Sequence, residues 1–133
     1  MSNDRAYRYP TTCYLRWADD QAINSSDWTE VWSQTDDGIL YEMLLVFNTA
    51  NVDLKITTDT FKVMEFDLSE LSSTFGLGAT DQVGTFSLAS YANNRWAFRP
   101  VTPLFWDSSI SVEAKSQQGN RRVTAGISVV GVR

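Results

Sequence analysis

The stretch NVDLKITTDTFKVMEFDL, residues 51–68, decides the fold of this 133-residue chain. It contains two runs in which apolar and polar residues alternate, separated by the polar residues 57–60. In the first run Val52, Leu54 and Ile56 share one side, which is typical of a β-strand with one buried face. We therefore predict a β-hairpin. The acid and three hydroxyls of residues 57–60 are expected to end that hairpin, because no base accompanies them to form a catalytic set.

The second run breaks its own alternation. Phe61 and Val63 lie on one parity, whereas Met64, Phe66 and Leu68 lie on the other. Since a strand alternates sides at every residue, the switch at Val63–Met64 predicts a bulge or a change of sheet. A short helical turn is expected directly afterwards at residues 68–73, capped by Asp67 or Ser69.

Similar short strand patterns recur along the rest of the chain, including residues 11–17, 39–47, 109–115 and 121–133. The turn TDDG at residues 35–38 is expected to place Gly38 at positive φ. The sum is roughly eight or nine strands with at most one short helix, because no amphipathic helix of 10–15 residues separates the strands. The sequence thus predicts an all-β fold, an antiparallel β-sandwich that is jelly-roll-like. We expect an N-terminal arm at residues 1–10 and a single sandwich domain at residues 11–133.

Composition argues against several classes of function. The chain has no histidine and one cysteine, Cys13, so it offers no Ser-His-Asp triad, no Cys-His dyad and no ordinary zinc site. The polar start MSNDRAYRYPTT lacks the apolar segment of a signal peptide, and no apolar run reaches the roughly 20 residues that span a bilayer. A net charge of −5 disfavours nucleic-acid binding. We expect a protein that is not an enzyme, has no cofactor or metal and binds neither nucleic acid nor membrane.

Charge is unevenly distributed along the chain. Residues 1–70 carry 13 acidic and 5 basic residues, a net charge of −8, and residues 71–133 carry a net charge of +3. Ordinary scatter of charges over solvated faces explains this asymmetry. The alternative is a molecule with two oppositely charged ends that attract each other in neighbouring subunits.

Candidate binding residues come from the five tryptophans. Indole rings pack against the apolar faces of sugars, but most tryptophans here lie inside strand patterns and are expected in the core. Trp28 and Trp32 lie beside loop and turn residues, and with Trp106 they are the candidate contact residues. The pairs Asp19-Asp20 and Asp36-Asp37 are assigned to turns, since neighbouring aspartates do not form a glycosidase dyad or a calcium loop by themselves.

A family resemblance rests on the order of several segments. These are GILYEMLLVF, NVDLKITTDT, VMEFDLSEL, WAFRPVTPLFWDSSISVEAKS and RRVTAGISVV, which together cover about residues 38–130. Their pattern resembles small β-sandwich proteins of tailed-bacteriophage virions. Those proteins have a glycine-led strand, a hairpin, a short D-L-x-x-L turn and an F-x-P-x-x-P crossover. The hairpin differs here, because related chains often have Asp-Gly where this chain has Asp59-Thr60.

The resemblance implies a structural protein of the virion, namely a head decoration, a head fibre or a tail component, with no catalytic residues. Its expected partners are itself, as a homo-oligomer, and other virion proteins. Its expected location is the virion, assembled in the host cytoplasm. The alternative is a carbohydrate-binding β-sandwich module that uses exposed tryptophan, so a glycan is the less favoured partner.

Overall fold

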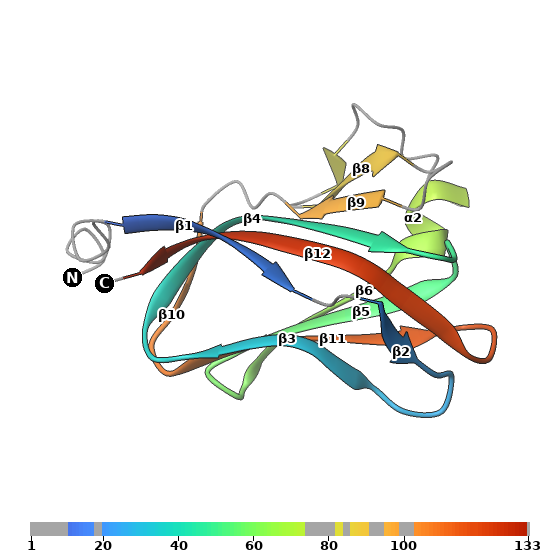
Figure 1. Ribbon diagram of the computed structural model, residues 1–133, viewed down its shortest axis with the longest axis horizontal. Coiled ribbons are helices and arrows are strands. Elements are labelled where there is room, and N and C mark those ends of the chain that lie inside the picture. The colour runs from blue at the N-terminus through green and yellow to red at the C-terminus, as the bar shows by residue number, and fades with distance from the viewer. Residues whose placement is uncertain are drawn as a thin grey trace.

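The computed structural model describes residues 11–17, 20–73, 82–83, 86–90, 95–98 and 103–132. These residues form twelve strands and one short helix (Figure 1). The strands are β1 Thr11–Trp17, β2 Gln21–Ile23, β3 Thr29–Thr35, β4 Gly38–Phe47, β5 Val52–Thr58, β6 Lys62–Asp67, β7 Gln82–Val83, β8 Phe86–Ser90, β9 Arg95–Phe98, β10 Leu104–Trp106, β11 Ser109–Ser116 and β12 Arg121–Val132, and the helix is α2 Leu68–Ser73. The predicted all-β class is confirmed. Nine of these strands have four or more residues, and the other three are short. The predicted arm at residues 1–10 lies outside the described residues.

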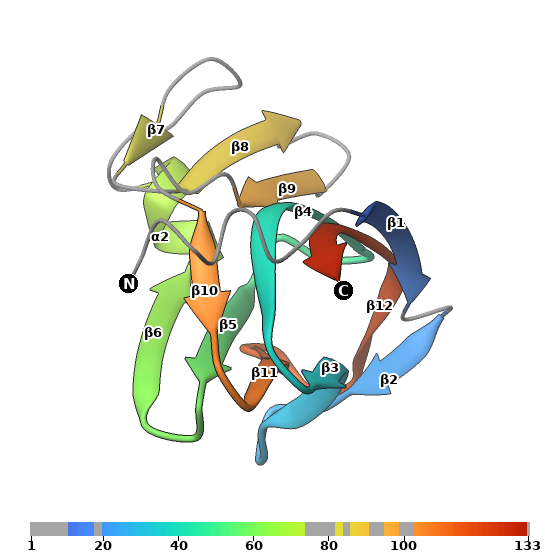
Figure 2. The ribbon, with the colours of Figure 1, turned by 90° about the vertical axis from the view of Figure 1, so that its left-hand side faces the viewer.

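The strands form two antiparallel sheets that face each other (Figure 2). One sheet has the order β1-β12-β4-β9-β8-β7, with β10 beside β4 and β2 beside β12, and the other has the order β3-β11-β5-β6. The chain passes repeatedly from one sheet to the other, so most neighbouring strands are distant in sequence. This strand order is that of a jelly roll, as predicted.

The core lies between the two sheets. Alternate residues of β5 point into it, and Val52, Leu54 and Ile56 are fully buried. From β11, Ile110, Val112 and Ala114 do the same. The period-two pattern of the sequence therefore identified the buried faces of these two strands correctly.

The parity switch in β6 has a different cause from the one predicted. The pairing of β5 with β6 runs without a shift from Asp53–Asp67 to Thr58–Lys62, so the predicted bulge or change of sheet at Val63–Met64 is wrong. Met64 packs against the core, whereas Val63 points outward. The apolar parity changes because Phe61 and Val63 are apolar but exposed, whereas Met64 packs against the core.

A bulge does occur in β3. Trp32 pairs with Val112 and Glu30 pairs with Glu113, which leaves Val31 as an extra residue between them. Because the bulge breaks the alternation, the neighbours Val31 and Trp32 are both buried.

Gly38 has a packing role instead of the predicted positive φ. In this turn Asp36 takes the left-handed conformation, with φ 66°. A Cβ atom at Gly38 would lie 2.2 Å from Cζ2 of Trp106, so only glycine fits beneath the indole. The Trp106 Nε1–H also donates to the backbone oxygen of Asp36 at 2.6 Å, which fixes the ring over the turn.

Helix α2 begins where the sequence indicated. Asp67 Oδ1 accepts hydrogen bonds from the Glu70 backbone N–H at 3.1 Å and the Ser69 hydroxyl at 2.8 Å, so Asp67 is the cap. With six residues, α2 is too short to cross a membrane, and it is the one helix of the described residues.

The two halves of the chain, which differ in net charge, share both sheets. β11, from the basic half of the chain, lies between β3 and β5, and β12 lies between β1 and β4. The two halves of the chain therefore interleave in both sheets, and the dipolar interpretation stays a prediction.

Candidate functional site

The β5–β6 hairpin carries an exposed apolar tip, which we define as residues 58–63. Phe61 is 70% exposed and Val63 is 53% exposed, the two highest values among the large apolar side chains of the described residues. The next is Ile127 at 38%, on β12 of the other sheet. Phe61 and Val63 are two positions apart in the chain, and exposed apolar residues that are close neighbours make a candidate contact surface.

The backbone of the tip is unusual. Asp59 and Thr60 both have positive φ, 55° and 65°, and the Phe61 N–H donates to the Thr58 oxygen at 3.3 Å. Positive φ at both central residues is characteristic of a type I′ turn, although three residues separate the paired Thr58 and Lys62 instead of two. Strand pairing resumes at Thr58 and Lys62, so Phe61 stands outside the ladder.

Asp59 fixes the tip to the loop between β10 and β11. Its Oδ1 accepts hydrogen bonds from the backbone N–H groups of Asp107 at 2.9 Å and Ser108 at 2.7 Å, with a weaker one from Ser109 at 3.4 Å. Its own N–H donates to the Ser109 oxygen at 2.8 Å. The hairpin is thus held to its neighbour at the turn itself, which orders the backbone that presents Phe61.

Electrostatics follow from these contacts. Burial acts to raise the pKa of Asp59, but the hydrogen bonds from Ser108, Asp107 and Ser109 outweigh it and leave the pKa below its ordinary value. The carboxylate is therefore ionised at neutral pH and occupied by backbone donors. This is a structural role, as expected for an acid that ends a hairpin.

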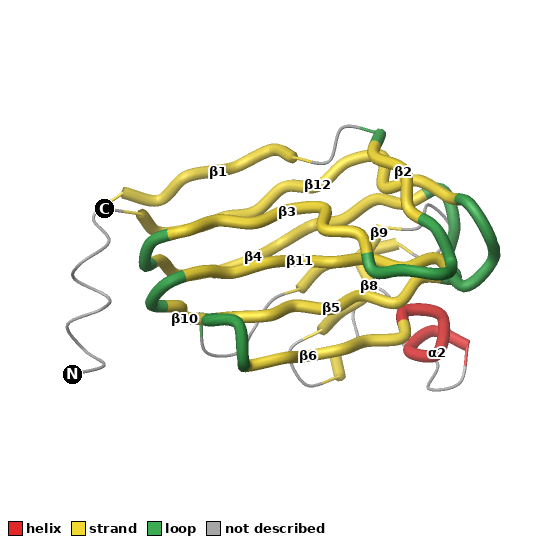
Figure 3. Tube along the Cα trace, turned by 90° about the horizontal axis from the view of Figure 1, so that it is seen from below, coloured by secondary structure: helices red, strands yellow, loops and turns green. Residues whose placement is uncertain are grey.

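The tip continues into an edge strand. β6 is the outermost strand of the four-stranded sheet, and Figure 3 shows the β5–β6 turn at the end of the sandwich opposite α2. Lys62, Val63 and Glu65 of β6 are all exposed. The outer edge of β6 pairs with no strand of the described residues, and such an edge can pair with another chain.

Two of the three candidate contact tryptophans lie in the core. Trp106 is fully buried beside Gly38, and Trp32 is 8% exposed. Trp32 stacks on Trp17, with ring centroids 5.9 Å apart. The prediction that Trp32 and Trp106 contact a partner is therefore corrected. The bulge in β3 turns Trp32 inward, and Gly38 makes room for Trp106.

Trp28 is partly exposed and lines a hollow of about 400 Å³ with Asp53, Glu65, Phe66, Asp67 and Lys115. Two ammonium groups lie over its ring, Lys55 Nζ at 4.5 Å and Lys115 Nζ at 4.8 Å from the centroid. A sugar that stacked on the indole would have to displace cations already bound to it. Trp28 remains a candidate contact residue, but its ring is not an open platform.

Metal-ligating side chains do not converge in the described part of the chain, where no group of three or more aspartate, glutamate, cysteine or histidine residues could hold an ion. The acids near Trp28 have other partners. Gln117 Nε2 donates to both Asp53 Oδ1 and Asp67 Oδ1 at 2.8 Å. These carboxylates are thereby tied to the β11–β12 turn.

The sequence did not single out Phe61 and Val63 as candidate contact residues. Their signal was present in the parity switch, which we interpreted as backbone irregularity. Apolar residues on the solvent-facing side of a regular strand produce the same sequence pattern as a bulge.

Comparisons with known proteins identify no family for the chain. No protein-family model and no curated protein matches the chain. Two crystal structures of a serine protease of Aeromonas sobria, one of them in complex with the chaperone ORF2, cover 92% and 94% of the chain at 10% and 9% identity. The TM-score is 0.38 in both, and the chain spans 28% of each protease chain. This likeness is too weak to carry an argument about function.

Proposed function

We propose that the protein is a non-enzymatic structural subunit that self-associates through the apolar tip and docks on a larger particle. The observation that carries this proposal is the exposure of Phe61 and Val63 on an ordered hairpin. Complete burial of an exposed Phe or Val side chain releases about 1.5–3 kcal/mol, and Phe61 and Val63 would gain the part that corresponds to their exposed fractions. Pairing of the outer edge of β6 with a partner strand would add backbone hydrogen bonds to that gain.

The occupant we propose for the apolar tip is a second copy of the chain. Identical edge strands pair antiparallel around a twofold axis, so that each contributes the same surface. An axis at Val63 would place the two Val63 side chains opposite each other on one face. The same register would set each Phe61 opposite Glu65 of the second copy, which keeps the two Glu65 carboxylates apart.

The particle we propose is a bacteriophage virion, in which the chain would be a head decoration, a head fibre or a tail component. The support is the segment pattern of residues 38–130 together with a sandwich that offers a contact surface. In this proposal the partners are the chain itself and other virion proteins.

Light scattering across a wide range of protein concentration tests the self-association, and mass spectrometry of purified phage particles tests the location. We expect a mass above that of the monomer, and peptides of this chain in the particles. A strictly monomeric protein that is absent from particles would overturn the proposal.

The second candidate function, glycan binding at Trp28, has the partly exposed indole in its favour and the two lysines over the ring against it. A titration of tryptophan fluorescence with neutral glycans separates the two functions. Saturable binding that is lost in Trp28→Ala would favour the glycan module.

A further inference from the structure

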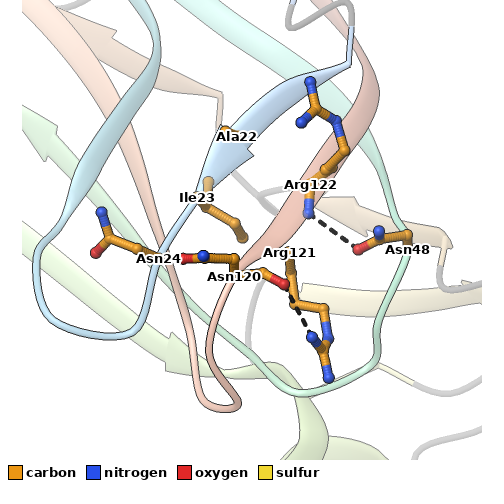
Figure 4. Close-up of a pocket in the computed structure, with 7 residues that line it drawn as sticks. All are labelled: Ala22, Ile23, Asn24, Asn48, Asn120, Arg121 and Arg122. Atoms are coloured by element: carbon orange, nitrogen blue, oxygen red, sulfur yellow. Dashed lines mark hydrogen bonds between the residues drawn. The ribbon is translucent and has the colours of Figure 1, made fainter.

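A hollow of about 490 Å³ lies at the end of the sandwich opposite the apolar tip (Figures 1 and 4). We call it the arginine hollow. Three segments line it: the end of β2, the start of the β4–β5 connection and the β11–β12 turn. The lining residues are Ala22, Ile23, Asn24, Asn48, Asn120, Arg121 and Arg122. Its volume is within the range of small-molecule sites.

Hydrogen bonds hold two of these segments together. The Arg122 backbone N–H donates to Asn48 Oδ1 at 3.0 Å, and the Asn48 N–H donates to the Arg122 oxygen at 3.1 Å. The Arg122 guanidinium is paired with Asp20, with Nε 2.5 Å from the carboxylate. The wall formed by Asn48 and Arg122 is therefore preformed, and the charge of Arg122 is neutralised.

The groups that remain available in the hollow are mainly donors. Because Asn48 Oδ1 accepts from the backbone, its NH₂ group is the end left for a ligand. The side-chain amide of Asn120 has no hydrogen-bond partner among the described residues, and Figure 4 shows it between Asn24 and Arg121. Asn24 itself is committed to its own turn, where Oδ1 accepts from the Asp27 N–H at 2.9 Å.

Arg121 supplies the charge. Its guanidinium makes one hydrogen bond, from Nη1 to the Asn120 backbone oxygen at 2.8 Å, and pairs with no carboxylate of the described residues. Among the described residues, those that line the hollow include no acid. A guanidinium with free N–H groups matches an oxyanion, which it binds through two parallel hydrogen bonds.

We infer that the arginine hollow binds a small hydroxylated ligand that carries an oxyanion, such as a sugar acid or a sugar phosphate. Arg121 pairs with the carboxylate or phosphate, and the amides of Asn48 and Asn120 bind neighbouring hydroxyl groups. This site shares no residue with the apolar tip, so it does not depend on the proposed function.

Calorimetric titration of the full chain with four probes tests the inference: glucuronate, glucose 6-phosphate, glucose and inorganic phosphate. We expect at least one charged sugar to bind about tenfold or more tightly than glucose. Comparing glucuronate with glucose 6-phosphate tells whether the oxyanion is a carboxylate or a phosphate. Equal binding of glucose and both charged sugars, or no binding of either charged sugar, would overturn the inference.

A matched pair of variants locates the binding. Arg121→Gln should weaken binding of the charged sugar about tenfold or more. Arg95→Gln removes the same charge from an exposed residue of β9, outside the residues that line the hollow, and should leave binding unchanged. If Arg121→Gln, folded as judged by its thermal midpoint, binds like the parent, the site is wrong. If both variants weaken binding equally, the effect is one of net charge, and the inference also fails.

Discussion

The carboxylate oxygen of Asp59 lies 2.7 Å from the backbone nitrogen of Ser108, a residue 49 positions further along the chain. This contact joins the turn between β5 and β6 to the loop between β10 and β11. Phe61, two residues after Asp59, therefore lies on a turn whose backbone is fixed by hydrogen bonds to the neighbouring loop and to Thr58. The exposed apolar side chain sits on an ordered surface, which lowers the entropy lost when a partner binds.

The first prediction concerns pH. The pKa of Asp59 is lowered by folding, so its contribution to stability is fully present above its ordinary value of 3.8 and is lost as the pH falls through the lower, folded value. We expect the urea midpoint to fall steadily below about pH 4. Asp67 has a lowered pKa too and contributes with the same sign.

Asp59→Asn is the control for this prediction, since asparagine accepts the same hydrogen bonds and tolerates positive φ without titrating. Its urea midpoint should depend less on pH between about pH 4 and pH 2 than that of the parent. An identical pH dependence in the two proteins would show that Asp59 does not contribute.

The second prediction concerns Thr60, a β-branched residue with φ 65°. This conformation costs an L-residue about 1–2 kcal/mol, and glycine avoids that cost while losing part of the gain to chain entropy. Thr60→Gly should therefore stabilise the fold by about 1 kcal/mol, measured by urea unfolding. Thr60→Ala, which keeps a Cβ atom, should give little of this gain, and an equal gain in both variants would contradict the strain argument.

The third prediction compares two glycines. Gly38→Ala should destabilise the fold by about 1–3 kcal/mol or more, because the new Cβ would press on the buried ring of Trp106. Gly119→Ala, with φ 68° and nothing within 4 Å, should incur only the backbone cost of about 1 kcal/mol. Thermal or urea unfolding of both variants gives the comparison. A smaller loss at Gly38 than at Gly119 would show that the indole moves aside at little cost.

The sequence predicted the architecture well because period-two alternation reports directly which side of a strand is buried. That logic gave the inward residues of β5 and β11, and the preference for Asp or Ser at a helix N-cap predicted Asp67 or Ser69 as the cap of α2. It failed where a tertiary contact decides the conformation. Nothing local in the turn TDDG reveals that Trp106, far along the chain, packs on Gly38. Nothing local in residues 29–35 reveals that a bulge in β3, opposite β11, turns Trp32 inward.

The candidate site was predictable only in part. The sequence assigned residues 57–60 to a hairpin end, and the structure adds that Asp59 binds the backbone of residues 107–109. Alternation alone cannot separate a bulge from exposed apolar residues, because both shift the apolar parity. The sequence therefore indicated tryptophans beside turns as contact residues, and it did not distinguish Phe61 and Val63 from residues of an irregular strand.

Sedimentation velocity of the double variant Phe61→Ser/Val63→Ser tests self-association through the apolar tip most directly. Both side chains are exposed, so each change should alter stability by no more than about 0.5 kcal/mol. The control Ile127→Ser removes an exposed apolar group from the other sheet. We predict that the parent and the control sediment as an assembly, while the double variant sediments as a folded monomer. A double variant that assembles like the parent would contradict the account.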